Sequence, residues 1–161
     1  MHGYELFHLF ALDLGHVWHL SQSQLYATLQ RLQARGWIQA AVAAAERGAE
    51  RHVFSLTPVG RAQAETWLHT PSRCSVQLIR LELPTRLYIL ERLAPQDLPE
   101  FLARQRAEIL RGLEALQAHC RSVPDSQPYH RMACSLRIHQ LQALLQWFDE
   151  TFHLPTNGET S

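Results

Sequence analysis

Two pairs of metal-ligating side chains lie late in this 161-residue sequence: His119 beside Cys120, and His130 four residues before Cys134. Imidazole and thiolate groups are the ligands that Zn²⁺ prefers in proteins. The spacing, however, lacks the paired Cys-x-x-Cys arrangement of a zinc module, and two ligands do not complete a tetrahedron. We therefore expect no metal site, and we expect no other cofactor.

Acidic side chains form two candidate pairs for general acid and base chemistry, Asp149 with Glu150 and Glu82 with Glu91. The sequence contains no Gly-x-Ser-x-Gly, no His-Glu-x-x-His and no phosphate-binding glycine loop. We interpret the four carboxylates as solvated charges, and we predict that the protein is not an enzyme.

Polar side chains in residues 20–38 have a pattern that suits nucleic-acid recognition. Leu25, Leu29 and Leu32 recur at positions i, i+4 and i+7, which predicts a helix with one apolar stripe against a core. The opposite face carries small or hydrogen-bonding residues, which can enter a major groove and contact base edges and phosphates. These residues are Ser23, Ala27, Gln30, Arg31 and Ala34, with Gln24 and Tyr26 at the flanks. An ordinary amphipathic surface helix has the same periodicity.

The ends of this helix are marked by Ser21 and Gly36. A serine hydroxyl can accept a hydrogen bond from a free amide of the first turn, and glycine readily adopts the left-handed conformation that ends a helix. A helix over residues 2–14 and a turn over residues 16–20 precede it, and strands over residues 37–44 and 51–56 follow it. This order predicts a winged helix-turn-helix.

The following hairpin adds three candidate contacts to those of the helix. The residues that we expect to contact double-stranded operator DNA are Ser21, Gln22, Ser23, Tyr26, Gln30, Arg31, Arg47, Arg51 and His52.

Several motifs, in the right order over about the first seventy residues, resemble the PadR family of bacterial transcriptional regulators. The motifs are His2-Gly3-Tyr4-Glu5-Leu6, Trp18-His19-Leu20-Ser21, Leu25-Tyr26-Ala27-Thr28-Leu29-Gln30-Arg31-Leu32, Gly36-Trp37-Ile38 and Phe54-Ser55-Leu56-Thr57-Pro58-Val59-Gly60. The resemblance implies a winged-helix domain, a helical dimerisation domain behind it, and repression that a small molecule relieves.

The sequence departs from that family at three places. The family commonly has proline at the position of Ala27, glutamate at the position of Gln33, and a proline before Arg51. These changes put the operator sequence in doubt more than the fold.

Charge and composition limit the classes of protein to which this chain can belong. The chain is 46% hydrophobic and 19% charged, which is typical of a globular protein, and no run of residues is long and apolar enough for a membrane span. Residues 1–70 contain five arginines and five acidic residues, so their formal charge is zero and each monomer should bind DNA modestly. Cys74, Cys120 and Cys134 have no paired spacing, which predicts free thiols and a cytoplasmic location.

The second half of the sequence predicts helices over residues 75–93, 95–119 and 129–152. Pro71-Ser72 marks a boundary before them. Two long helices with wide apolar faces cannot bury those faces alone, so we expect a homodimer held by residues 122–154 and the helices before them. The expected interface residues are Leu136, Leu141, Leu144, Leu145 and Phe148. An effector cavity is expected near Trp18, Trp67 or Trp147.

The start of the sequence also carries an expectation. In proteins that resemble this one, an additional apolar helix precedes the motif that begins at His2. A third helix would cover the apolar stripe formed by residues of both early helices, namely Leu6, Leu9, Phe10, Leu25, Leu29 and Leu32. Either the true chain begins upstream of Met1 or the carboxy-terminal helices cover this stripe. We favour the first alternative, with the first helix of the domain missing and Met1 an internal methionine.

Together these patterns predict a mainly α (α+β) protein with a winged helix-turn-helix DNA-binding domain over residues 1–70 and a helical dimerisation domain over residues 71–161. The favoured function is that of a sequence-specific DNA-binding regulator, a homodimeric repressor released by a small-molecule effector. The alternative is a helical dimeric interaction protein whose winged-helix domain has lost DNA binding, because its amino-terminal half is electrically neutral.

Overall fold

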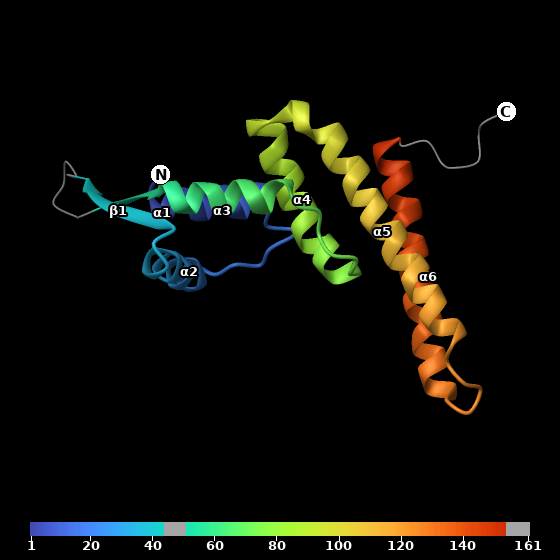
Figure 1. The fold of residues 1–161 in the computed structure, drawn as a ribbon. Helices are drawn as coiled ribbons and strands as arrows, with labels where there is room; N and C mark the ends of the chain where they lie inside the picture. The colour runs from blue at the N-terminus through green and yellow to red at the C-terminus, as the bar shows by residue number, and fades with distance from the viewer. Residues whose placement is uncertain (44–50, 154–161) are drawn as a thin grey trace. The chain divides into compact units, whose positions relative to one another are not determined.

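The computed structural model describes residues 1–43 and 51–153, which form two compact units. The first unit is Met1–His69, and the second begins at Thr70. Helices make up most of both units, and within the described ranges the first unit has a two-stranded sheet (Figure 1). The predicted mainly α fold class is therefore confirmed. No helix in these ranges has the length and apolar character that crossing a membrane requires.

The first unit opens with two helices, α1 (Gly3–Asp13) and α2 (Gln22–Ala34). Helix α1 starts at His2, whose backbone N–H donates to Oε2 of Glu5 at 2.9 Å. The helix ends at Leu14, which is buried. Leu25 and Leu29 of α2 form a small core with Ile38, against which half-buried apolar residues pack. Those residues are Leu6, Phe7, Leu20, Leu32 and Phe54. The predicted leucine stripe thus faces a core.

Strands β1 (Ile38–Ala43) and β2 (Arg51–Leu56) pair antiparallel, with Ile38 opposite Leu56. The predicted hairpin strands are confirmed. The first residues of the chain lie along β2 as well, because the Phe54 N–H donates to the Met1 carbonyl at 3.0 Å and the amino group of Met1 donates to the Phe54 carbonyl at 3.1 Å. Helix α3 (Pro58–His69) follows β2 directly.

The second unit contains α4 (Val76–Leu93), a short 3-10 turn η1 (Pro95–Asp97), α5 (Leu98–Arg121) and α6 (Pro128–Phe152). Helices α5 and α6 lie side by side as an antiparallel hairpin (Figure 1). We predicted a single helix over residues 95–119, but its first three residues form the 3-10 turn. The α-helix then begins with Pro99 in its first turn, where a missing N–H costs no hydrogen bond.

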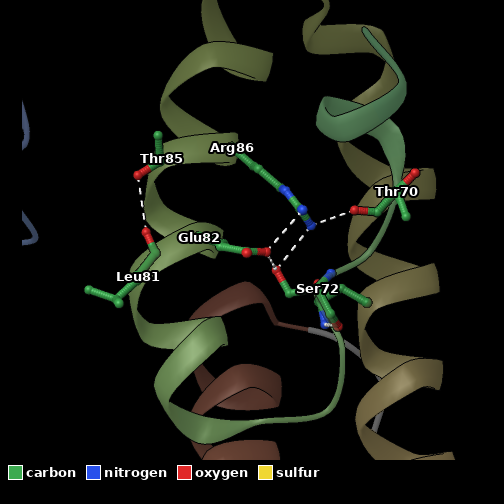
Figure 2. Close-up of polar contacts among 7 residues, drawn as sticks. Thr70, Ser72, Leu81, Glu82, Thr85 and Arg86 are labelled. Atoms are coloured by element: carbon green, nitrogen blue, oxygen red, sulfur yellow. Dashed lines mark hydrogen bonds and ion pairs between the residues drawn. The ribbon is translucent and has the colours of Figure 1, made fainter. Parts of the chain in front are cut away.

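The segment before α4 is held by a buried polar network (Figure 2). Arg86 of α4 donates to the Thr70 carbonyl and, at 3.0 Å, to the Ser72 hydroxyl, and it pairs with Glu82 at 3.0 Å. From α5, the fully buried Gln105 accepts from the Ser72 N–H at 2.7 Å and donates to the Ser72 carbonyl at 3.0 Å. Burial lowers the pKa of Arg86, and the charge of Glu82 opposes that shift. Sequence reasoning missed this network.

Two acidic residues that we interpreted as solvated charges are paired instead. Asp149 of α6 is buried and accepts two hydrogen bonds from the Arg106 guanidinium of α5, at 2.6 and 2.8 Å. These bonds raise the pKa of Arg106. Glu82 is the partner of Arg86 described above. Asp149 was misinterpreted because its partner lies on another helix, whereas Glu82 pairs with a residue four positions further along its own helix, a spacing that the interpretation did not consider.

The prediction of three free thiols is also wrong for two of the cysteines. Cys120, in the last turn of α5, and Cys134 of α6 form a disulfide with their Cα atoms 5.8 Å apart. The turn between the helices folds the chain back, so that two residues 14 apart in sequence become neighbours. Cys74 is free and half-buried against α5, where its thiol lies 3.7 Å from the Ile109 carbonyl oxygen.

Candidate nucleic-acid interface

The start of α2 is fixed by reciprocal hydrogen bonds between Ser21 and Gln24. The Gln24 N–H donates to the Ser21 hydroxyl at 3.3 Å, and the Ser21 N–H donates to Oε1 of Gln24 at 2.8 Å. This capping box satisfies two amides that would otherwise lack a partner. The predicted capping role of Ser21 is confirmed, and Gln24 is held by the cap rather than free to contact DNA.

The end of α2 is closed by Gly36, which has a positive φ of 69°. The Gly36 N–H donates to the Gln33 carbonyl at 2.9 Å, and the Trp37 N–H donates to the Leu32 carbonyl at 3.0 Å. This pair of bonds is a Schellman motif, which requires the left-handed residue that glycine supplies at least cost. The chain therefore leaves α2 in a defined direction and enters β1.

The face of α2 opposite the leucine stripe is exposed along its length. Gln24, Ala27, Gln30, Arg31 and Ala34 line a shallow open hollow on this face. Nη2 of Arg31 donates to the Thr28 hydroxyl at 2.9 Å, which orients the guanidinium along the helix. The small alanine side chains leave room for the wall of a DNA groove. The longer Gln and Arg side chains beside them can form hydrogen bonds to bases or phosphates.

The remaining predicted residues of α2 lie near its first turn. Gln22 and Ser23 are exposed, and the Ser23 hydroxyl lies 3.2 Å from that of Ser21. Tyr26 is 37% exposed, and its ring packs on the buried Gly3 of α1. Any larger residue at Gly3 would displace this ring, so the glycine in the His-Gly-Tyr-Glu-Leu motif positions Tyr26.

Thr57 joins the sheet to α3 and to the end of α2. Its hydroxyl donates to the Gly36 carbonyl at 2.6 Å and accepts from the Gly60 N–H at 3.0 Å, while its N–H donates to the Trp37 carbonyl at 3.0 Å. Pro58 occupies the first position of α3, where its missing N–H is tolerated. The Thr-Pro-Val-Gly motif thus locks the hairpin onto the turn that follows α2.

Three predicted contacts belong to the hairpin. His52 is exposed on β2 opposite Val42. The backbone of Arg51 pairs with Ala43 as the first residue of β2. The side chain of Arg51 and the whole of Arg47 lie outside the described residues.

The residues predicted for a dimer interface do not share one environment. Leu141 and Phe148 are buried within the second unit itself, and Leu144 and Leu145 pack partly against its core. Leu136 is 60% exposed. It continues an apolar row on α6 with Tyr129 and Met132, which are 83% and 67% exposed. The sequence prediction included Leu136 but did not separate this row from the buried face, because it assigned one apolar face to α6, whereas α6 has two.

The three tryptophans considered for an effector site lie on separate elements. Trp18 precedes α2 and Trp67 belongs to α3, and both are 37% exposed. Trp147 of α6 contacts the rings of Phe148 and Phe152 edge-on. Their role in effector binding stays a prediction.

The order helix, turn, capped helix and two-stranded wing defines residues 1–69 as a winged helix-turn-helix. Residues 1–66 match the model of the family described as "Transcriptional regulator PadR-like family". Residues 79–154 match the family model described as "Virulence activator alpha C-term". The resemblance inferred from the motifs is therefore confirmed.

A Mycobacterium tuberculosis protein named as a probable transcriptional regulator is 28% identical over 69 residues. The match covers 43% of this chain and 36% of that protein, so this chain spans about a third of the relative's length.

Solved structures that match the chain include Bacillus subtilis PadR in complex with operator DNA, at 19% identity and a TM-score of 0.42, covering 96% of this chain and 90% of that one. Another is the Vibrio cholerae virulence activator AphA, at 21% identity and a TM-score of 0.34, covering 94% and 87%. These structural likenesses are weak, and the similarity to the family rests on residues 1–66.

Proposed function

We propose that this chain is a sequence-specific DNA-binding regulator that reads operator DNA with α2. The observation that carries the proposal is the exposed polar face of α2, which is capped at both ends and joined to the wing through Thr57. A helix that is fixed at both ends presents its side chains to a groove in one orientation, which sequence-specific recognition requires.

Within that face, we assign the contacts with bases or phosphates to Gln30 and Arg31. Gln22 and Ser23 flank the amino-terminal end, where free backbone N–H groups also attract phosphate. Ser21 caps α2, and it belongs to the proposed DNA contact set because it lies beside Ser23. Tyr26, His52, Arg47 and Arg51 complete the proposed contact set.

We also propose that the protein acts in the cytoplasm as a homodimeric repressor released by a small-molecule effector. Support for a dimer comes from the exposed row Tyr129, Met132 and Leu136 on α6, because apolar side chains in one row lose contact with water when a second copy covers them. Two copies double the phosphate contacts of a winged unit whose formal charge is zero.

A second function is favoured by that same neutrality, namely a helical interaction protein that no longer binds DNA. The two functions are separated by a gel-shift titration with the upstream intergenic DNA of its own gene, beside an unrelated duplex of equal length. A regulator binds the first duplex more tightly, and its affinity for both falls as salt rises. If neither duplex is shifted at low salt, the result would favour the interaction protein.

A further inference from the structure

Four metal-ligating side chains meet where α5 turns into α6. His119 and Cys120 belong to the last turn of α5, and His130 and Cys134 belong to the first two turns of α6. The ligand atoms of His119, His130 and Cys134 all lie within 4.8 Å of one another. The sulfur of Cys120 is bonded to that of Cys134, so a fourth ligand is adjacent.

The turn between the helices is built to hold this arrangement. The Ser122 N–H donates to the His119 carbonyl at 3.0 Å, and the Val123 N–H donates to the Cys120 carbonyl at 3.3 Å. Val123 is buried beneath the turn, and Pro128 begins α6. The end of α5 is therefore fixed by backbone bonds, and the Cys120–Cys134 disulfide holds the start of α6 beside it, so the four side chains converge.

The environment of the cluster suits a bound ion. Cys134 is buried, whereas both histidines are exposed, so the site has one dry side and one side open to water. An open hollow beside the cluster is lined by Cys120 and Cys134, and by Arg121 and Arg131, which provides an entry path from the cysteine side. The charge of Arg131 is paired with Asp125.

One histidine is already oriented for coordination. Nδ1 of His130 lies 3.1 Å from Oε1 of Gln127, an oxygen that can only accept. A hydrogen bond from Nδ1–H to this oxygen would leave the lone pair of Nε2 available to a metal ion. A metal-bound histidine in proteins typically donates its other N–H to such an acceptor, which fixes both the tautomer and the ring plane.

We propose that the reduced protein binds one Zn²⁺ through His119, Cys120, His130 and Cys134, as a closed structural site at the tip of the α5–α6 hairpin. Two thiolates and two imidazoles form the tetrahedral set that Zn²⁺ favours over Mg²⁺ or Ca²⁺. With metal–ligand bonds of about 2.0–2.3 Å, ligand atoms lie roughly 3.5 Å apart, so side-chain rotations alone close the gaps.

The disulfide and the zinc site are mutually exclusive states of the same two sulfurs. A dithiol reductant supplies two electrons and two protons, breaks the Cys120–Cys134 bond and becomes a disulfide itself. Zn²⁺ then displaces the two thiol protons as it binds. A Cα separation of 5.8 Å permits either state, and a reducing compartment favours the thiols.

This proposal replaces the expectation of no metal that the sequence alone supported. That expectation treated each neighbouring pair as a separate site with two ligands. The helical hairpin joins the two pairs, which sequence spacing does not reveal because the connecting turn must first be placed.

The test uses the full chain, reduced and kept under a non-thiol phosphine reductant. Metal content after incubation with Zn²⁺ and dialysis is measured for the wild type and for His119→Ala, His130→Ala and Cys134→Ser. His16→Ala and Cys74→Ser are the matched controls, because His16 is an exposed histidine of the first unit and Cys74 is the free cysteine. Circular dichroism verifies that each variant is folded.

We expect one Zn²⁺ per chain in the wild type and both controls, and at least a tenfold loss of affinity in each ligand variant. Co²⁺ in place of Zn²⁺ should give the visible absorption of a tetrahedral ion with thiolate charge transfer. Gln127→Ala should weaken binding by roughly 10–100-fold, as other outer hydrogen-bond partners do.

Thiol counting gives an independent readout. A thiol reagent should react with three cysteines in the metal-free reduced chain and with Cys74 alone when Zn²⁺ is bound. If the reduced wild type holds no more Zn²⁺ than Cys134→Ser, or if Zn²⁺ leaves all three thiols reactive, the site does not exist. The proposed site would also be overturned if bound Co²⁺ gave the spectrum of an octahedral ion without thiolate absorption.

Discussion

Gly60 lies against the backbone of Trp37 so closely that a Cβ at residue 60 would be 1.7 Å from the Trp37 carbonyl oxygen. That carbonyl also accepts the N–H of Thr57 at 3.0 Å. The first turn of α3 can therefore approach β1 only because residue 60 has no side chain. Glycine here is required for close packing and not for an unusual φ.

The first prediction concerns this contact. Gly60→Ala should lower the free energy of unfolding by about 1–3 kcal/mol or more, because overlap with backbone must be relieved by moving α3. Gly36→Ala, a matched change with open space around it, should cost about 1–2 kcal/mol for its left-handed conformation. Asparagine should recover stability at residue 36 but not at residue 60. Equal recovery at both positions in thermal melts would contradict this explanation.

The second prediction concerns the ion pair that joins α5 and α6. Asp149→Ala should lower the free energy of unfolding by roughly 3–5 kcal/mol, because Arg106 is left nearly buried without its partner. Arg104→Ala breaks the exposed pair with Glu100 and should cost under about 1 kcal/mol. Urea denaturation of both variants measures the difference. Similar midpoints would show that the Arg106–Asp149 pair is no more important than a surface pair.

The third prediction tests the proposed reading helix. Arg31→Ala should leave the fold intact, since Arg31 is exposed and bonds only to Thr28 among the described contacts. If Arg31 contacts a phosphate, its loss should weaken binding to all duplexes and lower the slope of log affinity against log salt concentration by about one per contact. If it contacts a base, its loss should instead reduce the discrimination between bases at one operator position by roughly 1–3 kcal/mol. Arg92→Ala, in the second unit, is the control. Unchanged affinity and slope for Arg31→Ala would remove this residue from the interface.

The fourth prediction concerns assembly. Leu136→Asp should shift a dimer to monomers, because a carboxylate in an apolar contact is left without a partner. Leu93→Asp, at a leucine of α4 that is 75% exposed, should leave the assembly unchanged. Leu141 is unsuitable for this experiment, since a charge there would disrupt the core of the second unit. Light scattering that shows a monomeric wild type at micromolar concentration would refute the proposed dimer.

The fifth prediction concerns pH. Burial raises the pKa of the Cys74 thiol above its ordinary value of 9.0, and the nearby carboxylate of Glu108 adds to the shift. The thiol is neutral in both folded and unfolded chains well below pH 9.0, so its contribution to stability is complete there. As pH rises further, the unfolded thiol ionises first, and this contribution is lost through the folded pKa. In Cys120→Ser/Cys134→Ser, alkylation of Cys74 should therefore require higher pH than in the unfolded chain. If alkylation of Cys74 depended on pH in the same way in the folded and unfolded chains, the predicted rise in the pKa would be wrong.

Features that depend on neighbours in sequence were predictable. The Ser21 cap, the Gly36 turn and the Thr57-Pro58 start of α3 follow from local chemistry, and the leucine spacing of α2 identifies its buried face. The same reasoning indicated which face of α2 is free for DNA, although the contacts themselves remain proposals.

Features that depend on the packing of distant segments were not predictable. Asp149 looks like a surface charge until α5 places Arg106 beside it, and Cys120 looks unpaired until the turn brings Cys134 back. Leu141 and Leu136 have the same hydrophobicity, but only the packing of α5 decides which of them is covered. Periodicity shows which residues share one face of a helix, but not which neighbouring segment covers that face.

The double hydrogen bond between Gln105 and the backbone of Ser72 has a kinetic consequence. Ser72 lies in a connecting segment, where amide protons normally exchange with solvent within fast local openings. Its N–H, however, is bound to a side chain that is fully buried in α5, 33 residues away. Release of that proton requires α5 to part from the segment. Deuterium uptake at this loop amide should therefore be as slow as in the middle of a long helix, a rare protection for a residue with no regular secondary structure.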